Sequence, residues 1–209
     1  MSEKTAPGQN ARRSQRDRTA ATRSRVIDAT ISSLVELGHA ATTISRVQER
    51  AGVARGTLLH HFPTRASLLV AVVEDVANRR LHVLADEVEH SGAAGWDAAV
   101  DLVWKDLQSP AFLAVLELWV AARTDADLRA ALVPVERTVF ESVHRAVTTV
   151  AADDDPRVPT LVQFTIDLLT GSTMTTLLVD DDGSQRVLLD RWRRAIPVLL
   201  GRSGAETWG

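Results

Sequence analysis

The sequence predicts an all-α protein with a small N-terminal domain of three helices and a larger C-terminal helical domain. Apolar residues recur at helical spacing, as Ile27, Ile31 and Leu34 do at i, i+4 and i+7. Breaks rich in Gly, Pro and Asp separate the helical stretches, and no alternating strand pattern, phosphate loop or repeat is found along the 209 residues. We expect a disordered basic tail over 1–18, a domain over 19–63, a linking helix over 64–80 and a second domain over 81–209.

Composition excludes several classes of protein. With 45% hydrophobic and 24% charged residues, the chain resembles an ordinary soluble globular protein. It has no cysteine, which excludes disulfides, zinc ribbons and thiol chemistry. The basic start leads into no apolar segment, so we expect no secretory signal and a cytoplasmic protein. The most apolar run, 158–179, contains Gln163 and Asp167, which favours a helix buried against partners over a membrane span.

Charge is distributed unevenly along the chain. Residues 1–80 contain 13 Lys and Arg against 7 Asp and Glu, whereas residues 81–209 contain 11 against 20. A basic front joined to an acidic rear indicates that the front alone meets a polyanion. The alternative is a chance excess in a solvated tail, because four of the arginines precede the first expected helix: Arg12, Arg13, Arg16 and Arg18.

The first three helices can be placed from their caps. A helix over about 19–37 ends at Gly38, where a left-handed backbone is easily adopted. Thr43 can cap a short second helix that ends at Gly52, and a third helix follows over about 54–61.

The fourth helix follows Pro63 and can be capped by Thr64. Its inner face is an apolar stripe of Leu68, Leu69, Val72, Val73 and Val76. Further helices are expected at about 81–90, 95–107, 110–123, 126–151, 160–179 and 185–200, the fourth of these kinked at Pro134.

The bend between the second and third helices, Ala51-Gly52-Val53, is typical of a helix-turn-helix. Gly52 can supply the positive φ of this turn without steric cost. The third helix then leaves at a steep angle and can enter a DNA major groove about 12 Å wide. Gly56 lacks a side chain, so a phosphate or a base edge can come close to the start of this helix.

Residues 43–65, TISRVQERAGVARGTLLHHFPTR, resemble the DNA-binding domain of the TetR family of transcriptional regulators, and the resemblance extends from about Val26 to Val73. It implies a regulator, and most often a repressor, that is not an enzyme and needs no cofactor. It also implies a double-stranded, pseudo-palindromic DNA operator, a small-molecule effector of unknown identity that releases the protein, and a helical ligand-binding and dimerisation domain. A homodimer through helices about 160–179 and 185–200 fits their apolar composition, because a helix apolar nearly all round must be covered.

Three residues depart from the family pattern. The family usually has alanine at the position of Gln48, serine or threonine at Ala54, and tyrosine at Leu59. A missing N-cap costs about 1 kcal/mol of helix stability, and losing a phosphate contact weakens binding without changing the sequence that is read. We therefore expect DNA binding with altered affinity or specificity.

The candidate DNA contacts lie on the second to fourth helices. We expect the groove-facing residues to be Arg55, Gly56, Thr57, Leu59 and His60. Thr43 and Arg65 resemble phosphate-contacting residues, and Arg46 and Arg50 either add charge near the backbone or form a solvated face. The tail arginines either follow a minor groove or stay solvated.

The adjacent His60 and His61 are not expected to bind a metal ion, because neighbouring helical residues point about 100° apart. His61 and Phe62 resemble residues that close the small helix-turn-helix core, and His60 faces DNA.

A ligand pocket in the second domain is a weaker hypothesis. Bulky apolar walls with a few polar groups can be built from Trp104, Leu116, Trp119, Phe140, His144, Phe164 and Asp167. The alternative is that the aromatic residues are ordinary core.

The sequence leaves two other functions as alternatives. Two Glu-x-x-His motifs, at 87–90 and 141–144, together with Glu74 and Glu117 mimic a di-iron bundle, but their spacing and helix ends disfavour convergence. A helical ligand- or partner-binding protein that has lost operator recognition is the stronger alternative, because of Ala54 and Leu59.

Overall fold

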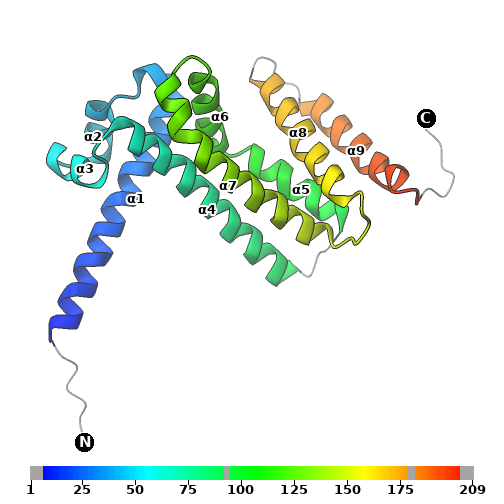
Figure 1. Ribbon diagram of the computed structural model, residues 1–209, viewed down its shortest axis with the longest axis horizontal. Helices are drawn as coiled ribbons and strands as arrows, with labels where there is room; N and C mark the ends of the chain where they lie inside the picture. Colours follow the sequence, from blue (N-terminus) through cyan, green and yellow to red (C-terminus); the bar gives the residue numbers. More distant parts are fainter. Residues whose placement is uncertain (1–6, 92–94, 178–181, 203–209) are drawn as a thin grey trace, which may run out of the picture. The chain divides into compact units, whose positions relative to one another are not determined.

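A computed structural model of the chain describes residues 7–91, 95–177 and 182–202 (Figure 1). The regular structure in these ranges is α-helical, which confirms the predicted fold class. The helices are α1 (Pro7–Ala41), α2 (Ile44–Ala51), α3 (Arg55–His61), α4 (Arg65–Ser91), α5 (Trp96–Leu107), α6 (Pro110–Ala122), α7 (Ala126–Ala151), α8 (Val158–Thr176) and α9 (Asp182–Leu199).

The helices form two compact units. The first unit comprises Met1–Asp75 and Ala114–Val135, and the second comprises Val76–Leu113 and Glu136–Gly209. The boundaries between them fall inside α4, α6 and α7. The first unit is therefore larger than the helix-turn-helix segment of residues 19–63, because most of α6 and the start of α7 also belong to it.

The core of the first unit includes the apolar face of α1, which packs against α2. Val26, Ile27 and Leu34 of α1 are buried. Burying such a side chain fully contributes about 1.5–3 kcal/mol relative to exposure. Thr30 and Ser33 are buried beside them, and their hydroxyls donate to backbone carbonyls one turn earlier. Also buried are Val47 of α2, Leu58 of α3, Phe62 just after α3, and Leu68, Leu69 and Val72 of α4.

Two helices are longer than expected. α1 begins at Pro7 and not at about Thr19, and its first turns extend beyond α2 and α3 (Figure 1). Residues 17–20, at the expected boundary, are exposed and form no buried apolar stripe, so periodicity gave no sign of a helix there. α4 runs unbroken from Arg65 to Ser91, whereas we expected separate helices over 64–80 and 81–90. No Gly or Pro interrupts the chain at that point.

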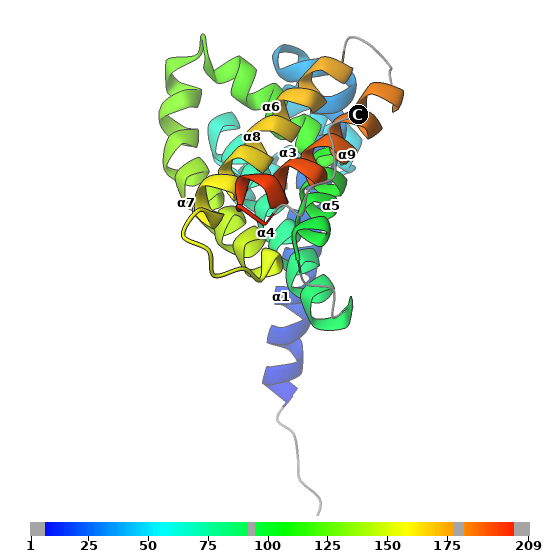
Figure 2. The ribbon, with the colours of Figure 1, turned by 90° about the vertical axis from the view of Figure 1, so that its right-hand side faces the viewer.

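In the second unit, α5 packs against both α8 and α9 (Figures 1 and 2). Its buried residues include Val100 and Val103, and the facing helices bury Leu161, Leu169 and Ile196. Within the described residues, none of the helices combines the length and the hydrophobicity that crossing a membrane requires. Thr165 and Thr173 of α8 are buried, and their hydroxyls donate to carbonyls one turn earlier, so these polar groups are satisfied inside the core.

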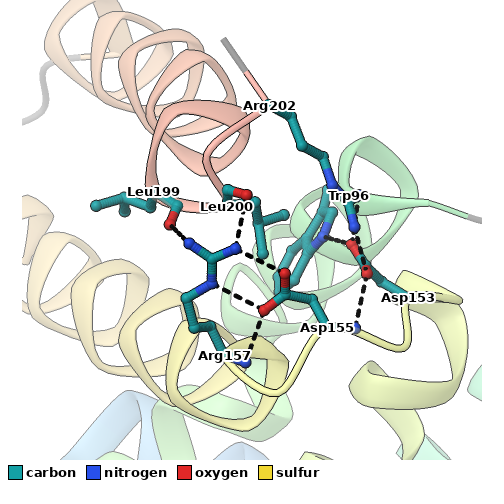
Figure 3. Close-up of polar contacts among 7 residues, drawn as sticks. All are labelled: Trp96, Asp153, Asp155, Arg157, Leu199, Leu200 and Arg202. Atoms are coloured by element: carbon teal, nitrogen blue, oxygen red, sulfur yellow. Dashed lines mark hydrogen bonds and ion pairs between the residues drawn. The ribbon is translucent and has the colours of Figure 1, made fainter.

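The end of α9 is held by an arginine from the start of α8 (Figure 3). The Arg157 guanidinium donates to the carbonyl oxygens of Leu199 at 2.9 Å and Leu200 at 2.7 Å. Asp155 pairs with the same guanidinium at 2.7 Å, and this pairing lowers the pKa of Asp155. The last carbonyls of a helix carry a partial negative charge, so a cation there is favourable.

Asp153 forms the second half of this network, which Figure 3 also shows. It accepts hydrogen bonds from Arg202 at 2.7 Å and from the Trp96 indole at 3.0 Å. The loop between α7 and α8 is thereby tied both to the residues after α9 and to the start of α5.

Candidate nucleic-acid interface

The turn between α2 and α3 has the geometry of a helix-turn-helix. The Thr43 hydroxyl accepts the Arg46 backbone N–H at 3.3 Å, which confirms the expected cap. Gly52 has φ 62° and ψ 40°, the left-handed conformation that was predicted. Its N–H donates to the Glu49 backbone carbonyl at 3.2 Å, and the N–H of Val53 donates to the Gln48 carbonyl at 3.3 Å. These two bonds are a Schellman motif, which ends α2 and turns the chain into α3.

One face of α3 is buried and the other is exposed. Leu58 is buried within α3, and Phe62 just after it is 2% exposed, so both fix the helix to the core. The exposed side presents Arg55, Gly56, Thr57 and His60. Leu59 is half-buried, at the edge of this face. Ala54 occupies the N-cap position and offers no side-chain acceptor, as the sequence suggested.

Some of the residues beside α3 are exposed to solvent, and others bond to neighbouring groups of the protein. Thr43, which caps α2, and Arg46 of α2 are exposed. Arg50 is engaged by Glu36 of α1 at 2.8 Å. Arg65 is half-buried, and its guanidinium donates to the backbone carbonyls of Thr42 and His39. It therefore stabilises the turn before α2. Gln48 is half-buried.

The adjacent histidines have different surroundings. His60 is exposed, whereas His61 is half-buried with its ring 6.1 Å from that of Phe62. Burial lowers the pKa of His61, which favours the neutral ring at neutral pH. The Arg23 guanidinium lies 5.4 Å from the centre of the Phe62 ring, on which it can form a cation–π contact. These contacts support the expected role of His61 and Phe62 at the edge of the small core.

Among the described residues, no group of three His, Asp or Glu side chains is placed to hold one metal ion. The side chains of Glu87 and His90, in the first Glu-x-x-His motif, lie outside the described residues.

The structure brings together only some of the seven residues predicted for a ligand pocket. Leu116 is buried and Trp119 is half-exposed in the first unit. In the second unit, Phe140 and His144 line an open hollow of about 630 Å³ between α7 and α8. The His144 ring nitrogen Nε2 lies 2.9 Å from the Pro159 carbonyl oxygen.

The remaining three do not line this hollow. Trp104 is half-buried, while Phe164 and Asp167 are exposed on α8. Asp167 accepts a hydrogen bond from Gln163 at 2.8 Å. A single pocket built from all seven residues therefore stays a prediction.

The geometry of α2, the Gly52 turn and α3 defines a helix-turn-helix DNA-binding protein. Comparison with known proteins gives the family. The family model for bacterial regulatory proteins of the tetR family matches residues 26–72. An uncharacterized HTH-type transcriptional regulator of Mycobacterium tuberculosis is 32% identical over 137 residues, which are 64% of this chain and 70% of that protein. The chain belongs to the TetR family and is a helix-turn-helix transcriptional regulator.

Other similar proteins are consistent with this family assignment. The regulator CymR of Pseudomonas putida is 35% identical over 135 residues, 61% of this chain and 63% of CymR. The multidrug binding protein EbrR, solved with imidazole, is 26% identical with a TM-score of 0.57, covering 81% of this chain and 93% of EbrR. A TetR-family member from Streptomyces coelicolor shares the fold at 24% identity, with a TM-score of 0.63 over 84% of this chain and 98% of that one.

Proposed function

We propose that the protein represses transcription by binding a pseudo-palindromic DNA operator and that a small molecule releases it. The observation that carries this proposal is the exposed face of α3, where Arg55, Gly56, Thr57 and His60 lie together with no acidic residue among them. An arginine can bond two acceptors of a guanine, and a threonine can contact either base polar atoms or a thymine methyl. Thr43 and Arg46 on α2 can contact the phosphate backbone. Its place of action would be the cytoplasm, where a bacterial operator lies.

Dimerisation would bring two such faces together. α8 and α9 expose large apolar side chains that a second copy could cover, with Phe164 53% and Leu177 56% exposed. Others are Met174, Val187, Val198 and Leu199. A two-fold dimer through these helices would match two half-sites about 34–36 Å apart.

For an effector to release the protein from DNA, the protein must have two conformations that bind the effector with different affinities. EbrR has been solved with imidazole and with malachite green, so that relative binds small molecules. By analogy, an effector of this protein would bind more tightly to a conformer whose half-site spacing does not fit the operator.

The test is selection of bound duplexes from a random DNA pool by the purified protein, at two salt concentrations. We expect an enriched inverted repeat whose affinity falls steeply as salt rises, because phosphate contacts release counterions. A folded dimer that enriches no sequence would contradict operator recognition.

The second candidate is a protein of the same fold that has lost operator recognition. The uncapped start of α3 at Ala54 and the half-buried Leu59 favour it. It would show no sequence preference and a weak salt dependence in the same experiment.

A further inference from the structure

We propose that Glu117 of α6 positions the helix-turn-helix for operator reading, by holding the turn that joins α1 to α2. Glu117 would be a positioning residue and would not touch DNA. The inference rests on the operator binding proposed above.

The turn begins where α1 breaks. Gly38 has φ 75° and ψ 171°, which interrupts the helix. The next N–H, that of His39, lacks a helical acceptor and instead donates to Glu117 Oε1 at 2.8 Å. A Cβ at residue 38 would lie 3.0 Å from this oxygen, so glycine allows the carboxylate to approach the turn. A hydrogen bond to a carboxylate is stronger than one between neutral groups.

A second side chain holds the other end of the turn. Arg65, the first residue of α4, donates from Nε to the Thr42 carbonyl at 3.0 Å and from Nη2 to the His39 carbonyl at 2.5 Å. The buried Thr42 hydroxyl donates to the Gly38 carbonyl at 2.8 Å. Side chains from α4 and α6 therefore satisfy an amide and two carbonyls of one turn.

This turn leads directly into the DNA-reading helices. Thr43, the next residue, caps α2, and the Schellman motif at Gly52 fixes α3 to α2. α2 and α3 have 8 and 7 residues, too few for a helix to be stable alone. Their placement thus depends on what holds the chain on either side, and Glu117 holds the preceding turn to α6 within the same unit.

Operator reading is sensitive to such placement. Two recognition helices must reach major grooves one helical turn apart, so looser placement of each α3 weakens the choice of half-site spacing. Non-specific binding depends on charge and needs no fixed spacing. Loss of the Glu117 contact should therefore reduce specific binding while leaving non-specific binding intact.

The experiment compares full-length wild type with Glu117→Ala, Glu117→Gln and the control Asp127→Asn, which removes an exposed carboxylate near the start of α7. Each is titrated with the selected operator, with operators whose half-site spacing is changed by one base pair, and with random DNA. Thermal unfolding is measured for all four.

We expect Glu117→Ala to bind the operator about 10-fold more weakly, the size of a lost charge-assisted hydrogen bond. Its preference for the native spacing should shrink and its Tm should fall by only about 2–4 °C, while its affinity for random DNA stays as in wild type. Glu117→Gln keeps an acceptor oxygen and should recover part of the loss, and Asp127→Asn should behave as wild type.

Hydrogen exchange gives a readout that needs no DNA. In Glu117→Ala, the amides of His39 and of α2 should exchange faster, because the turn opens more often. Unchanged exchange over α2, or an unchanged spacing preference, would overturn the inference. Equal losses on operator and random DNA would also overturn it, by showing a general structural defect. Failure of wild type to enrich any operator would instead refute the proposed function.

Discussion

Two glycines with positive φ play different parts in the DNA-binding unit. Gly52 is in the left-handed region, with open space where a Cβ would stand. Gly38 combines positive φ with extended ψ, a region that essentially only glycine adopts, and faces Glu117.

Alanine substitution at the two positions should show how far each one requires glycine. Gly52→Ala should lower the free energy of unfolding by about 1–2 kcal/mol, the cost of a left-handed residue. Gly38→Ala should cost more, about 3 kcal/mol, because its backbone region is more restricted and Glu117 is close. Urea unfolding measures both. Equal costs would contradict the assignment, and Gly38→Ala combined with Glu117→Ala shows how much of the loss is steric.

Two histidines make the stability of this unit depend on pH. Burial, followed by nearby Arg65, lowers the pKa of His39 below 6.5, while Asp125 and Glu117 oppose the shift. Burial also lowers the pKa of His61. The unfolded chain therefore takes up protons more readily than the folded one.

We expect both histidines to favour folding above pH 6.5, the ordinary value, and to lose this contribution as the pH falls below it. The urea midpoint should accordingly be lower at about pH 5.5 than at about pH 7.5. NMR titration of the two rings provides the check. Midpoints at or above 6.5 for both rings would contradict the expectation.

At the scale of single helices, α2 has a side-chain cap and α3 has none. Ala54 already has an extended backbone, φ −68° and ψ 145°, which suits a capping residue. Ala54→Ser should raise the free energy of unfolding by about 1 kcal/mol, and the reverse change on α2, Thr43→Ala, should lower it by a similar amount. Chemical denaturation of the two variants tests this. An Ala54→Ser variant with an unchanged free energy of unfolding would mean that solvent already satisfies the first amides of α3.

The exposed face of α3 can be tested residue by residue. Arg55→Ala and Thr57→Ala should each weaken operator binding by about 1–3 kcal/mol if the residue reads a base. Binding to random DNA should change much less. A residue whose loss affects both kinds of DNA equally contacts phosphate instead.

Local chemistry made α2 and α3 predictable. The Thr43 cap and the Gly52 turn each follow from residues within a few positions of them, so the sequence alone placed them correctly. The roles of Arg65 and Glu117 could not be predicted, because each bonds to backbone more than twenty residues away. The early start of α1 was missed because residues 17–20, at the expected boundary, are exposed and form no buried apolar stripe.

At the scale of the whole molecule, the apolar composition of α8 and α9 predicted surfaces that need cover, and large apolar side chains are indeed exposed there. The seven-residue ligand pocket stays a prediction, because aromatic residues at helical spacing do not tell which helices will face one another.

Dimerisation can be tested by placing a charge on α8. Phe164→Asp should shift the protein from dimer to monomer, because an aspartate buried in an apolar interface is costly. The monomer should stay folded, since Phe164 is exposed within its unit. Sedimentation velocity gives the association state. Val133→Asp on α7, where Val133 is 58% exposed, is the matched control and should remain dimeric. An unchanged dimer in Phe164→Asp would locate the interface elsewhere.

The inclusion of residues 114–135 in the unit that contains the helix-turn-helix bears on how chimeric regulators should be built. A fusion cut after residue 63 or 80 would leave the His39 amide without its carboxylate acceptor. When the effector-binding domains of two relatives are exchanged, residues 114–135 should therefore be transferred together with the helix-turn-helix. Otherwise, the chimera should keep both Glu117 and Gly38.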